Sequence, residues 1–370
     1  MIIKSYNDLY EEMPSPYNIK LAIINAGKNK TKNNKRHREL RFIKEHCDSE
    51  EVINQVRMNM VHFMPPKHRS IEINDGISAK KRNIIVPTVQ EVIVHHAVLN
   101  VLKPILAKGF YEHSYASIPN RGTHRAVKVI KKWIKNNHAG TKYCLKLDVR
   151  KFFESIDQEV LIRKLYRIIR DRQFMDILIK IIRTTDKGIP LGFTTSQWFA
   201  NYILTELDHK IKENFGVKYY IRFMDDMVIF GSNKKRLHQI KNQIEEYLNK
   251  ELHLELKDNW QVFFMDSIRS RKKKGKFLDF LGFKFYRTHT GIRRKVALRT
   301  QRKAKRIFKK RQGNKKVNIH EARQMVVYAG LCKYANCHDW FHTHVLKCVS
   351  IRKLRKQISV YDKLNAKRRC

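Results

Sequence analysis

The sequence has few acidic residues for its size. Asp and Glu total 34 against 78 Lys and Arg, which gives a formal net charge of +44 over 370 residues. An excess this large goes beyond what solubility requires and implies a polyanionic partner, with nucleic acid as the first candidate. A membrane surface is the weaker alternative, because the chain has no apolar run of 18 residues and no lipidation signal.

Cysteine is also scarce, and its six occurrences include no CxxC pair, which argues against a disulfide framework. Cys332, Cys337, His338 and His342 could be zinc ligands, but their spacing does not fit the usual patterns. The aromatic residues among them favour a helical packing segment instead. The first 13 residues are acidic and lack the apolar core of a signal peptide, so we expect a cytoplasmic protein.

The remaining composition is that of a folded protein, since 42% of the residues are hydrophobic. Apolar alternation around an Asn-Asp-Gly turn predicts a hairpin over 68–88. Helical spacing and strand-like alternation predict the other elements. We expect helices in 1–60, 89–106, 122–137 (with Thr123 as its cap), 159–184 (as one helix or two), 194–215 and 233–250 and after 292, and strands in 142–149, 252–257 and 276–288.

Three acidic residues stand where chemistry is expected. Asp148 ends a predicted strand, and Asp225 and Asp226 interrupt the apolar stretch YIRFMDDMVIFG. Adjacent like charges are costly in such a stretch, so the pair either caps an exposed turn or holds a cation. If the two elements are neighbours in one antiparallel sheet, the three carboxylates converge into a set of ligands suited to Mg²⁺. Two ions about 4 Å apart would then support nucleotidyl transfer.

The stretch RFMDDMVIF resembles the Y/F-x-D-D box of reverse transcriptases. Six other stretches resemble further motifs of that family and follow its order over roughly residues 65–290: KKRNIIVPT (80–88), SYASIPNRGTHRAV (114–127), LKLDVRKFFESID (145–157), GIPLGFTTSQWFANYILTELD (188–208), LELKDNWQVF (254–263) and DFLGFKF (279–285).

The resemblance implies an α+β fold of the right-hand polymerase type, with an antiparallel palm sheet flanked by helices and a helical thumb. The implied parts are a basic N-terminal helical extension (1–64), fingers (65–140), a palm (141–290, with finger helices inserted around 157–187) and a basic helical thumb (291–370).

The resemblance also implies the roles of individual residues. Asp148 and Asp225 match the metal-binding carboxylates, Asp226 the acid beside them, and Val149 a backbone carbonyl ligand. The cofactor would be two Mg²⁺ ions, with Mn²⁺ as a substitute. The dNTP-binding residues would be Arg82, Arg121, Phe153 (as a steric gate against ribose), Leu191, Gly192 and Lys257, and the primer grip would be Phe280, Leu281 and Gly282.

Some of these roles have plain alternatives. Arg82 could equally be a solvated charge in a basic hairpin, although a guanidinium suits bidentate binding of a triphosphate. For the primer-grip residues, a place in the core of a strand is an equally good account.

The stretch 188–208, which resembles the template-and-dNTP motif of reverse transcriptases, narrows the resemblance to one group within that family. It reads Leu191-Gly-Phe-Thr-Thr-Ser-Gln, a form similar to that of diversity-generating retroelement reverse transcriptases. In that family the loss of Gln at the position of Leu191 accompanies error-prone copying at template adenines. The implied partners are a structured noncoding RNA template, the RNA–DNA duplex, dNTPs and a small basic accessory protein, with no membrane.

Other interpretations stay open. The box reads Phe-Met-Asp-Asp here and Tyr-Ala-Asp-Asp in most diversity-generating enzymes. Antiphage-defence reverse transcriptases, which synthesise DNA from a partner noncoding RNA, are the main alternative, followed by retron-like and domesticated intron enzymes. A function of another class, RNA binding on a degenerate polymerase scaffold, is disfavoured because clustered carboxylates would repel phosphates.

Overall fold

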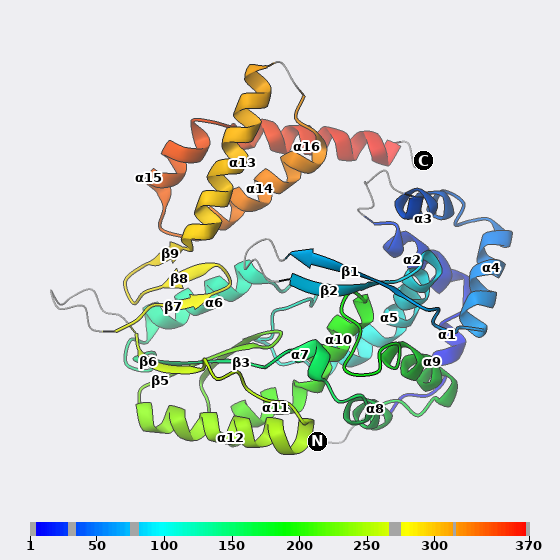
Figure 1. The fold of residues 1–370 in the computed structure, drawn as a ribbon, viewed down its shortest axis with the longest axis horizontal. Helices are drawn as coiled ribbons and strands as arrows, with labels where there is room; N and C mark the ends of the chain where they lie inside the picture. The colour runs from blue at the N-terminus through cyan, green and yellow to red at the C-terminus, as the bar shows by residue number, and fades with distance from the viewer. Residues whose placement is uncertain (1–4, 29–34, 75–80, 266–274, 314–315, 368–370) are drawn as a thin grey trace. The chain divides into compact units, whose positions relative to one another are not determined.

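The computed structural model describes residues 5–28, 35–74, 81–265, 275–313 and 316–367 (Figure 1). The chain divides into two compact units. The first unit comprises Met1–Asn120, Lys146–Val228 and His238–Trp260, and the second comprises Arg121–Leu145, Ile229–Leu237 and Gln261–Cys370. These units are interleaved in sequence and do not correspond one to one with the four expected parts, whose boundaries stay a prediction.

The N-terminal region is helical, as expected. The helices are α1 (Leu9–Glu12), α2 (Pro16–Ala26), α3 (Lys35–Glu45) and α4 (Glu50–Val61). Helix α2 begins in a standard way, because the Ser15 side chain accepts a hydrogen bond from the backbone N–H of Asn18 and Pro16 occupies the first turn. It packs on α5 (Val89–Gly109), where the Asn18 amide donates to the carbonyl of Ala97 (3.2 Å).

The predicted hairpin of 68–88 is confirmed. Strands β1 (Arg69–Asn74) and β2 (Lys81–Val86) pair antiparallel, with Arg69 opposite Val86 and Asn74 opposite Lys81. The Asp-Gly part of the expected Asn-Asp-Gly turn lies outside the described residues. Thr88 then caps α5 through a reciprocal capping box with Glu91, which fixes where the helix starts.

A four-stranded sheet carries the predicted acids. Its strands are β3 (Tyr143–Asp148), β4 (Tyr219–Phe223), β5 (Asp226–Gly231) and β6 (Gln261–Phe264), and their order across the sheet is β4-β5-β3-β6. Helix α12 (Lys234–Leu252) runs along one side of the sheet in Figure 1. It buries Leu237, Ile240, Ile244 and Leu248 at helical spacing.

Helices of the first unit connect these strands. They are α7 (Phe152–Ser155), α8 (Gln158–Tyr166), α9 (Arg172–Ile182), α10 (Thr194–Ile203) and α11 (Thr205–His209), followed by the π-helical turn η1 (Lys210–Asn214). The single helix expected over 194–215 is therefore three successive elements. Residues 252–257, expected to be a strand, contribute only an isolated bridge between Val149 and Leu256.

The second unit contains α6 (Thr123–Asn136) and the small antiparallel sheet β7 (Leu278–Phe280), β8 (Phe283–Phe285) and β9 (Thr290–Ile292). Gly122, rather than the expected Thr123, is the N-cap of α6. The C-terminal region is helical: α13 (Arg294–Gln312), α14 (Ile319–Cys332), α15 (His338–Phe341), the π-helical turn η2 (His342–Leu346) and α16 (Ile351–Lys367). These helices share one apolar cluster, which includes Ala304, Ile307, Ala322, Met325, Val345 and Leu354.

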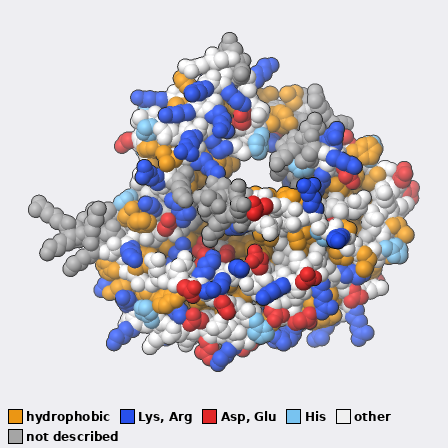
Figure 2. Space-filling model, viewed as in Figure 1, with side chains coloured by type: hydrophobic (Ala, Val, Ile, Leu, Met, Phe, Trp, Pro, Cys, Tyr) orange, Lys and Arg blue, Asp and Glu red, His pale blue; other side chains and the backbone are white. Residues whose placement is uncertain are grey.

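The α+β fold expected from the sequence is confirmed. Lys and Arg side chains are spread over much of the face drawn in Figure 2, as the net charge predicts. Within the described ranges, no helix combines the length and the apolar character needed to cross a bilayer. The cytoplasmic location stays a prediction.

Candidate active site

Two of the three predicted acids lie on neighbouring strands, and the third lies in the turn just before one of them. Asp148 is the last residue of β3, Asp226 is the first residue of β5, and Asp225 stands in the tight turn between β4 and β5. Because β5 and β3 are adjacent in the sheet, the carboxyl groups of Asp148 and Asp225 lie close enough for the charge of Asp148 to raise the pKa of Asp225. The expectation that strand end and hairpin turn converge is therefore met by the topology.

Burial and like charge act on this cluster together. Burial, and after it the charges of the Asp148 and Asp226 carboxyl groups, together raise the pKa of Asp225 to about 7. A protonated Asp225 relieves the repulsion near neutral pH. The same sheet edge would favour a bound cation, which removes the repulsion without a proton.

Two lysines supply part of the missing positive charge. The Nζ of Lys257 lies 2.5 Å from Oδ2 of Asp148, and the Nζ of Lys146 lies 3.9 Å from Oδ1 of Asp226. The backbone N–H of Lys257 also donates to the carbonyl of Asp148 (2.8 Å). Lys257, expected to bind dNTP, is thus placed against the first acid, and Lys146 is a neighbour that sequence reasoning missed.

The residues present fit a divalent cation in chemistry. Oδ1 of Asp148 is buried and accepts no hydrogen bond, which leaves an anionic oxygen available to a metal ion. Among the described residues, no group of three or more His, Cys, Asp or Glu side chains already has metal-binding geometry, the expected zinc alternative included. Asp148 is held by Lys257 instead, so cation binding has to compete with that ion pair.

A buried arginine supports the turn that carries Asp225. Arg222 on β4 is fully buried and forms a bidentate ion pair with the equally buried Asp208, at 2.6 Å from Nη2 to Oδ2 and 2.8 Å from Nε to Oδ1. Its Nη1 donates to the carbonyl of Met224 (3.0 Å), the residue just before Asp225. The sequence analysis did not assign Arg222 a role; the signal that could have revealed it is a charged residue inside an apolar strand.

That hydrogen bond holds an unusual backbone conformation. Met224 has φ +59°, in the left-handed region that non-glycine residues rarely adopt. Such a conformation persists only where the surroundings over-determine it. The guanidinium of Arg222, fixed by Asp208, is one such constraint and keeps Asp225 directed to the sheet edge.

The residues of the predicted template motif contact the β1–β2 hairpin through backbone atoms. The N–H of Ile85 on β2 donates to the carbonyl of Leu191 (2.8 Å). Gly192 has φ +122°, and a Cβ at this position would stand 2.4 Å from the carbonyl oxygen of Ile85. The chain therefore needs glycine here, both for conformation and for space. Arg82 lies exposed on the same strand β2.

The predicted steric gate follows the first acid. Phe152 is buried, as expected for a core residue, whereas Phe153 is only partly buried. The carbonyl of Phe153 accepts a hydrogen bond from Ile189 (2.8 Å), which joins α7 to the 188–192 turn. Val149 is buried and bridges to Leu256.

The remaining predicted residues belong to the second unit. Arg121 precedes α6, and Phe280, Leu281 and Gly282 form the connection from β7 to β8. Leu281 and Gly282 both have positive φ (52° and 87°), the requirement of a type I′ two-residue turn. Phe280 is buried, so it serves the strand core whatever else it does.

Comparison with known families identifies the chain. The profile of the family described as reverse transcriptase (RNA-dependent DNA polymerase) matches residues 66–285, which include all three acids. The chain belongs to this reverse transcriptase family.

Several curated proteins are similar over shorter stretches. Protein YkfC of Escherichia coli is 26% identical over 165 residues, which cover 42% of this chain and 43% of YkfC. The group II intron-encoded protein LtrA of Lactococcus lactis is 27% identical over 43% of this chain and 28% of its own length. The retron Ec73 reverse transcriptase of Escherichia coli is 26% identical over 49% of this chain and 60% of its own. The matches thus span less than two thirds of each relative.

Solved structures of telomerases are also similar. Telomerase from Candida albicans, in complex with a fragment of telomeric RNA, aligns with a TM-score of 0.48 and 12% identity, over 82% of this chain and 60% of that one.

The Arg222–Asp208 pair predicts a specific stability pattern. Arg222→Met leaves a carboxylate buried without its cation and should destabilise the protein by about 3–5 kcal/mol in urea unfolding. Arg222→Met combined with Asp208→Leu should recover much of that loss. The matched control is Arg183→Met, which removes an exposed pair with Glu159 and should cost under about 1 kcal/mol. A loss from Arg222→Met no larger than that of Arg183→Met would contradict the buried-charge argument.

The raised pKa of Asp225 predicts a pH dependence. The folded state holds the Asp225 proton up to about pH 7, whereas the unfolded chain releases it near 3.8. Metal-free protein should therefore lose stability as pH rises through this window, and Asp225→Asn should abolish that loss. We expect the melting temperature of Asp225→Asn to exceed that of wild type at pH 8 and to match it near pH 4. Asp186→Asn, in an exposed turn, is the control; an equal gain at both pH values would refute this account.

Proposed function

We propose that this protein is an RNA-directed DNA polymerase that copies a dedicated noncoding RNA into cDNA by two-metal nucleotidyl transfer. The observation that carries the proposal is the clustering of Asp148, at the end of β3, with Asp225, in the turn that leads into the adjacent strand β5. Both lie inside the region that matches the reverse transcriptase family. A pure RNA-binding protein gains nothing from mutually repelling carboxylates at a site for phosphates.

The acids and Lys257 would have different roles at the reacting atoms. Asp148, Asp225, Asp226 and the carbonyl of Val149 would hold two divalent ions, Mg²⁺ by the hardness of the oxygen donors and Mn²⁺ as a substitute. Such ions activate an attacking hydroxyl and offset the charge of a leaving pyrophosphate. Lys257, 2.5 Å from Asp148, would donate a proton or hydrogen bond to that pyrophosphate once Asp148 is engaged elsewhere.

The first unit would also position the incoming nucleotide. Arg82, exposed on β2, can bind the triphosphate bidentately. Leu191 and Gly192 join that hairpin to the 188–192 turn, so nucleotide and template would meet a surface fixed by backbone contacts. Phe153 would exclude a ribose 2′-hydroxyl, which favours dNTPs over rNTPs. In the second unit, Arg121 would add charge for the nucleotide.

The basic helices would hold the nucleic acid. Helix α13 presents ten Lys and Arg residues without an acid, and α3 carries a further basic stretch. Contacts of such side chains with phosphates fix position and not sequence, which suits the RNA–DNA duplex and a structured RNA template. The β7–β8 turn, with Phe280, Leu281 and Gly282, would grip the primer end.

For the biological role we propose a diversity-generating retroelement, in which copying is error-prone at template adenines and a small basic accessory protein takes part. Leu191 supports this proposal, because an aliphatic side chain cannot make the hydrogen bonds of a glutamine amide at that place. The second candidate is an antiphage-defence enzyme that makes DNA from a partner noncoding RNA. The Phe-Met-Asp-Asp form of the box favours it.

The catalytic proposal predicts a loss of incorporation on removal of one charge. Asp225→Asn should lower Mg²⁺-dependent dNTP incorporation on a DNA-primed RNA template by at least about 10²-fold, because ion binding and its charge compensation are lost. Asp186→Asn should stay within about twofold of wild type. Full incorporation by Asp225→Asn would refute the catalytic role of Asp225. A wild-type protein that bound RNA but made no DNA would refute the polymerase proposal and leave RNA binding as the function.

The two biological roles are separated by fidelity. For a diversity-generating enzyme, sequenced cDNA should carry substitutions concentrated opposite template adenines, and Leu191→Gln should reduce them several-fold. For a defence enzyme, wild type should already copy adenines as faithfully as other bases, and Leu191→Gln should leave the spectrum unchanged. Leu346→Gln, at an exposed position of the second unit, controls for an added amide.

A further inference from the structure

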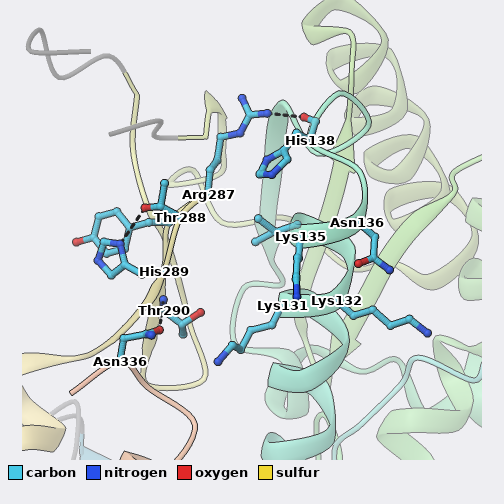
Figure 3. A pocket seen from close by; sticks show the side chains of 12 residues that line it. Lys131, Lys132, Lys135, Asn136, His138, Arg287, Thr288, His289, Thr290 and Asn336 are labelled. Atoms are coloured by element: carbon cyan, nitrogen blue, oxygen red, sulfur yellow. Dashed lines mark hydrogen bonds between the residues drawn. The ribbon is translucent and has the colours of Figure 1, made fainter. Parts of the chain in front are cut away.

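A basic pocket lies wholly within the second unit. It has a volume of about 1050 Å³ and lies between the C-terminal half of α6 and the turn that joins β8 to β9 (Figure 3). Its lining includes Lys131, Lys132 and Lys135 from the helix and Arg287 and His289 from the turn. None of the acids, template-motif residues or primer-grip residues discussed above lines it.

The lysine and arginine side chains of the lining have no acidic counterpart among its described residues. It holds three lysines and one arginine and no Asp or Glu among the described residues. Lys132 and Lys135 are exposed, and neither has an ion-pair partner in the described part of the chain. In Figure 3 Lys135 and Arg287 extend from opposite walls of the pocket. Charges left uncompensated on two facing walls create a strong local potential for an anion.

The pocket is held open by contacts of its own walls. Arg287 donates from Nη2 to the carbonyl of His138 (2.6 Å), which ties the turn to the end of α6. Lys131 donates to the carbonyl of Tyr334 (3.3 Å). The N–H of Thr290 donates to the side-chain oxygen of Asn336 (2.9 Å), which holds these two lining residues together. The site is therefore built before any ligand arrives.

An aromatic pair forms part of the rim. The rings of Tyr286 and His289 stack with centroids 4.3 Å apart and an interplanar angle of 8°. Their backbone is fixed by a hydrogen bond from the N–H of Tyr286 to the carbonyl of His289 (2.9 Å). Both side chains are only partly buried. A flat, partly exposed ring beside cationic side chains is the combination that binds an unpaired base together with its phosphates.

We propose that this pocket binds a single-stranded segment of RNA, separate from the strand being copied. Lys132, Lys135 and Arg287 would contact successive phosphates, and a base would stack on His289. An acidic peptide would satisfy the charges but offers no base to stack on His289. RNA is favoured over DNA because Asn136 and Thr288, which line the pocket, can pair with a 2′-hydroxyl.

The first test uses the salt dependence of binding by the full chain. The probe is a labelled 20-nucleotide oligo(rU), and the variant is Lys132→Ala with Lys135→Ala. Loss of two phosphate contacts should flatten the slope of log Kd against log salt by about 1.4 and weaken binding at least about tenfold at low salt. The matched control is Lys234→Ala with Lys235→Ala, which removes the same charge from exposed positions at the start of α12. Equal losses in both double variants would overturn the proposal.

The second test separates stacking from charge. His289→Ala should weaken oligo(rU) binding about fivefold or more, and His289→Phe should restore it, since a ring stacks without a charge. Failure of Phe to restore binding would overturn the stacking role. Asn136→Ala combined with Thr288→Val should weaken oligo(rU) binding more than binding of an oligo(dU) of equal length, because only RNA offers a 2′-hydroxyl to these side chains. Equal effects on the two oligonucleotides, or binding of a poly-glutamate peptide as tight as that of oligo(rU), would overturn the assignment to RNA.

A third measurement keeps this proposal apart from the catalytic one. On a preannealed RNA template with a DNA primer, the Lys132→Ala, Lys135→Ala variant should extend within about twofold of wild type. Absence of extension by wild type would refute the polymerase proposal and leave the pocket untouched. Extension by wild type, with unchanged oligo(rU) binding by the variant, would refute the pocket alone.

Discussion

The buried ion pair between Arg222 and Asp208 is the constraint on which the geometry of the first unit depends. Arg222 donates to Asp208, to the side-chain oxygen of Asn201 and to the carbonyl of Met224, while its own backbone bonds to His113 and Tyr115. The side chain and the backbone of this one residue together join two helices, the strand β4, the segment before α6 and the turn that carries Asp225. Such a pair adds little net stability, because desolvation offsets its attraction. What it supplies is one arrangement of these five pieces rather than several.

The acids occupy an electrostatically unfavourable place that this scaffold makes tolerable. Asp225 is partly buried next to two other carboxyl groups, and Met224 before it has a left-handed backbone. Lys146 and Lys257 offset part of the repulsion from the neighbouring strand and loop. Violations of local preference that gather at one point of an otherwise regular sheet are typical of functional sites. Binding of a cation would therefore stabilise this cluster of acids.

Much of this could be predicted from the sequence, and the failures have physical causes. Hairpins and amphipathic helices follow local patterns, so β1–β2, α5, α12 and the β4–β5 turn could be located. Residues 252–257 alternate like a strand but find only one bridging partner, at Val149. The single helix predicted over 194–215 is divided into α10, α11 and the π-helical turn η1. The helical spacing of apolar residues runs through all three and does not mark these divisions. Neither the Arg222–Asp208 pair nor the pocket beside α6 has a local signature, since each joins residues far apart in sequence.

The contact between β2 and the 188–192 turn has a consequence for evolution. The N–H of Ile85 donates to the carbonyl of Leu191, and the carbonyl of Ile85 lies against Gly192, so the docking of the two segments does not use the side chain at position 191. The neighbouring glycine cannot change without a collision, whereas the leucine can be exchanged with the backbone contact intact. If residue 191 contacts the template as proposed, single substitutions there would change how the template is read at little cost to the surrounding fold.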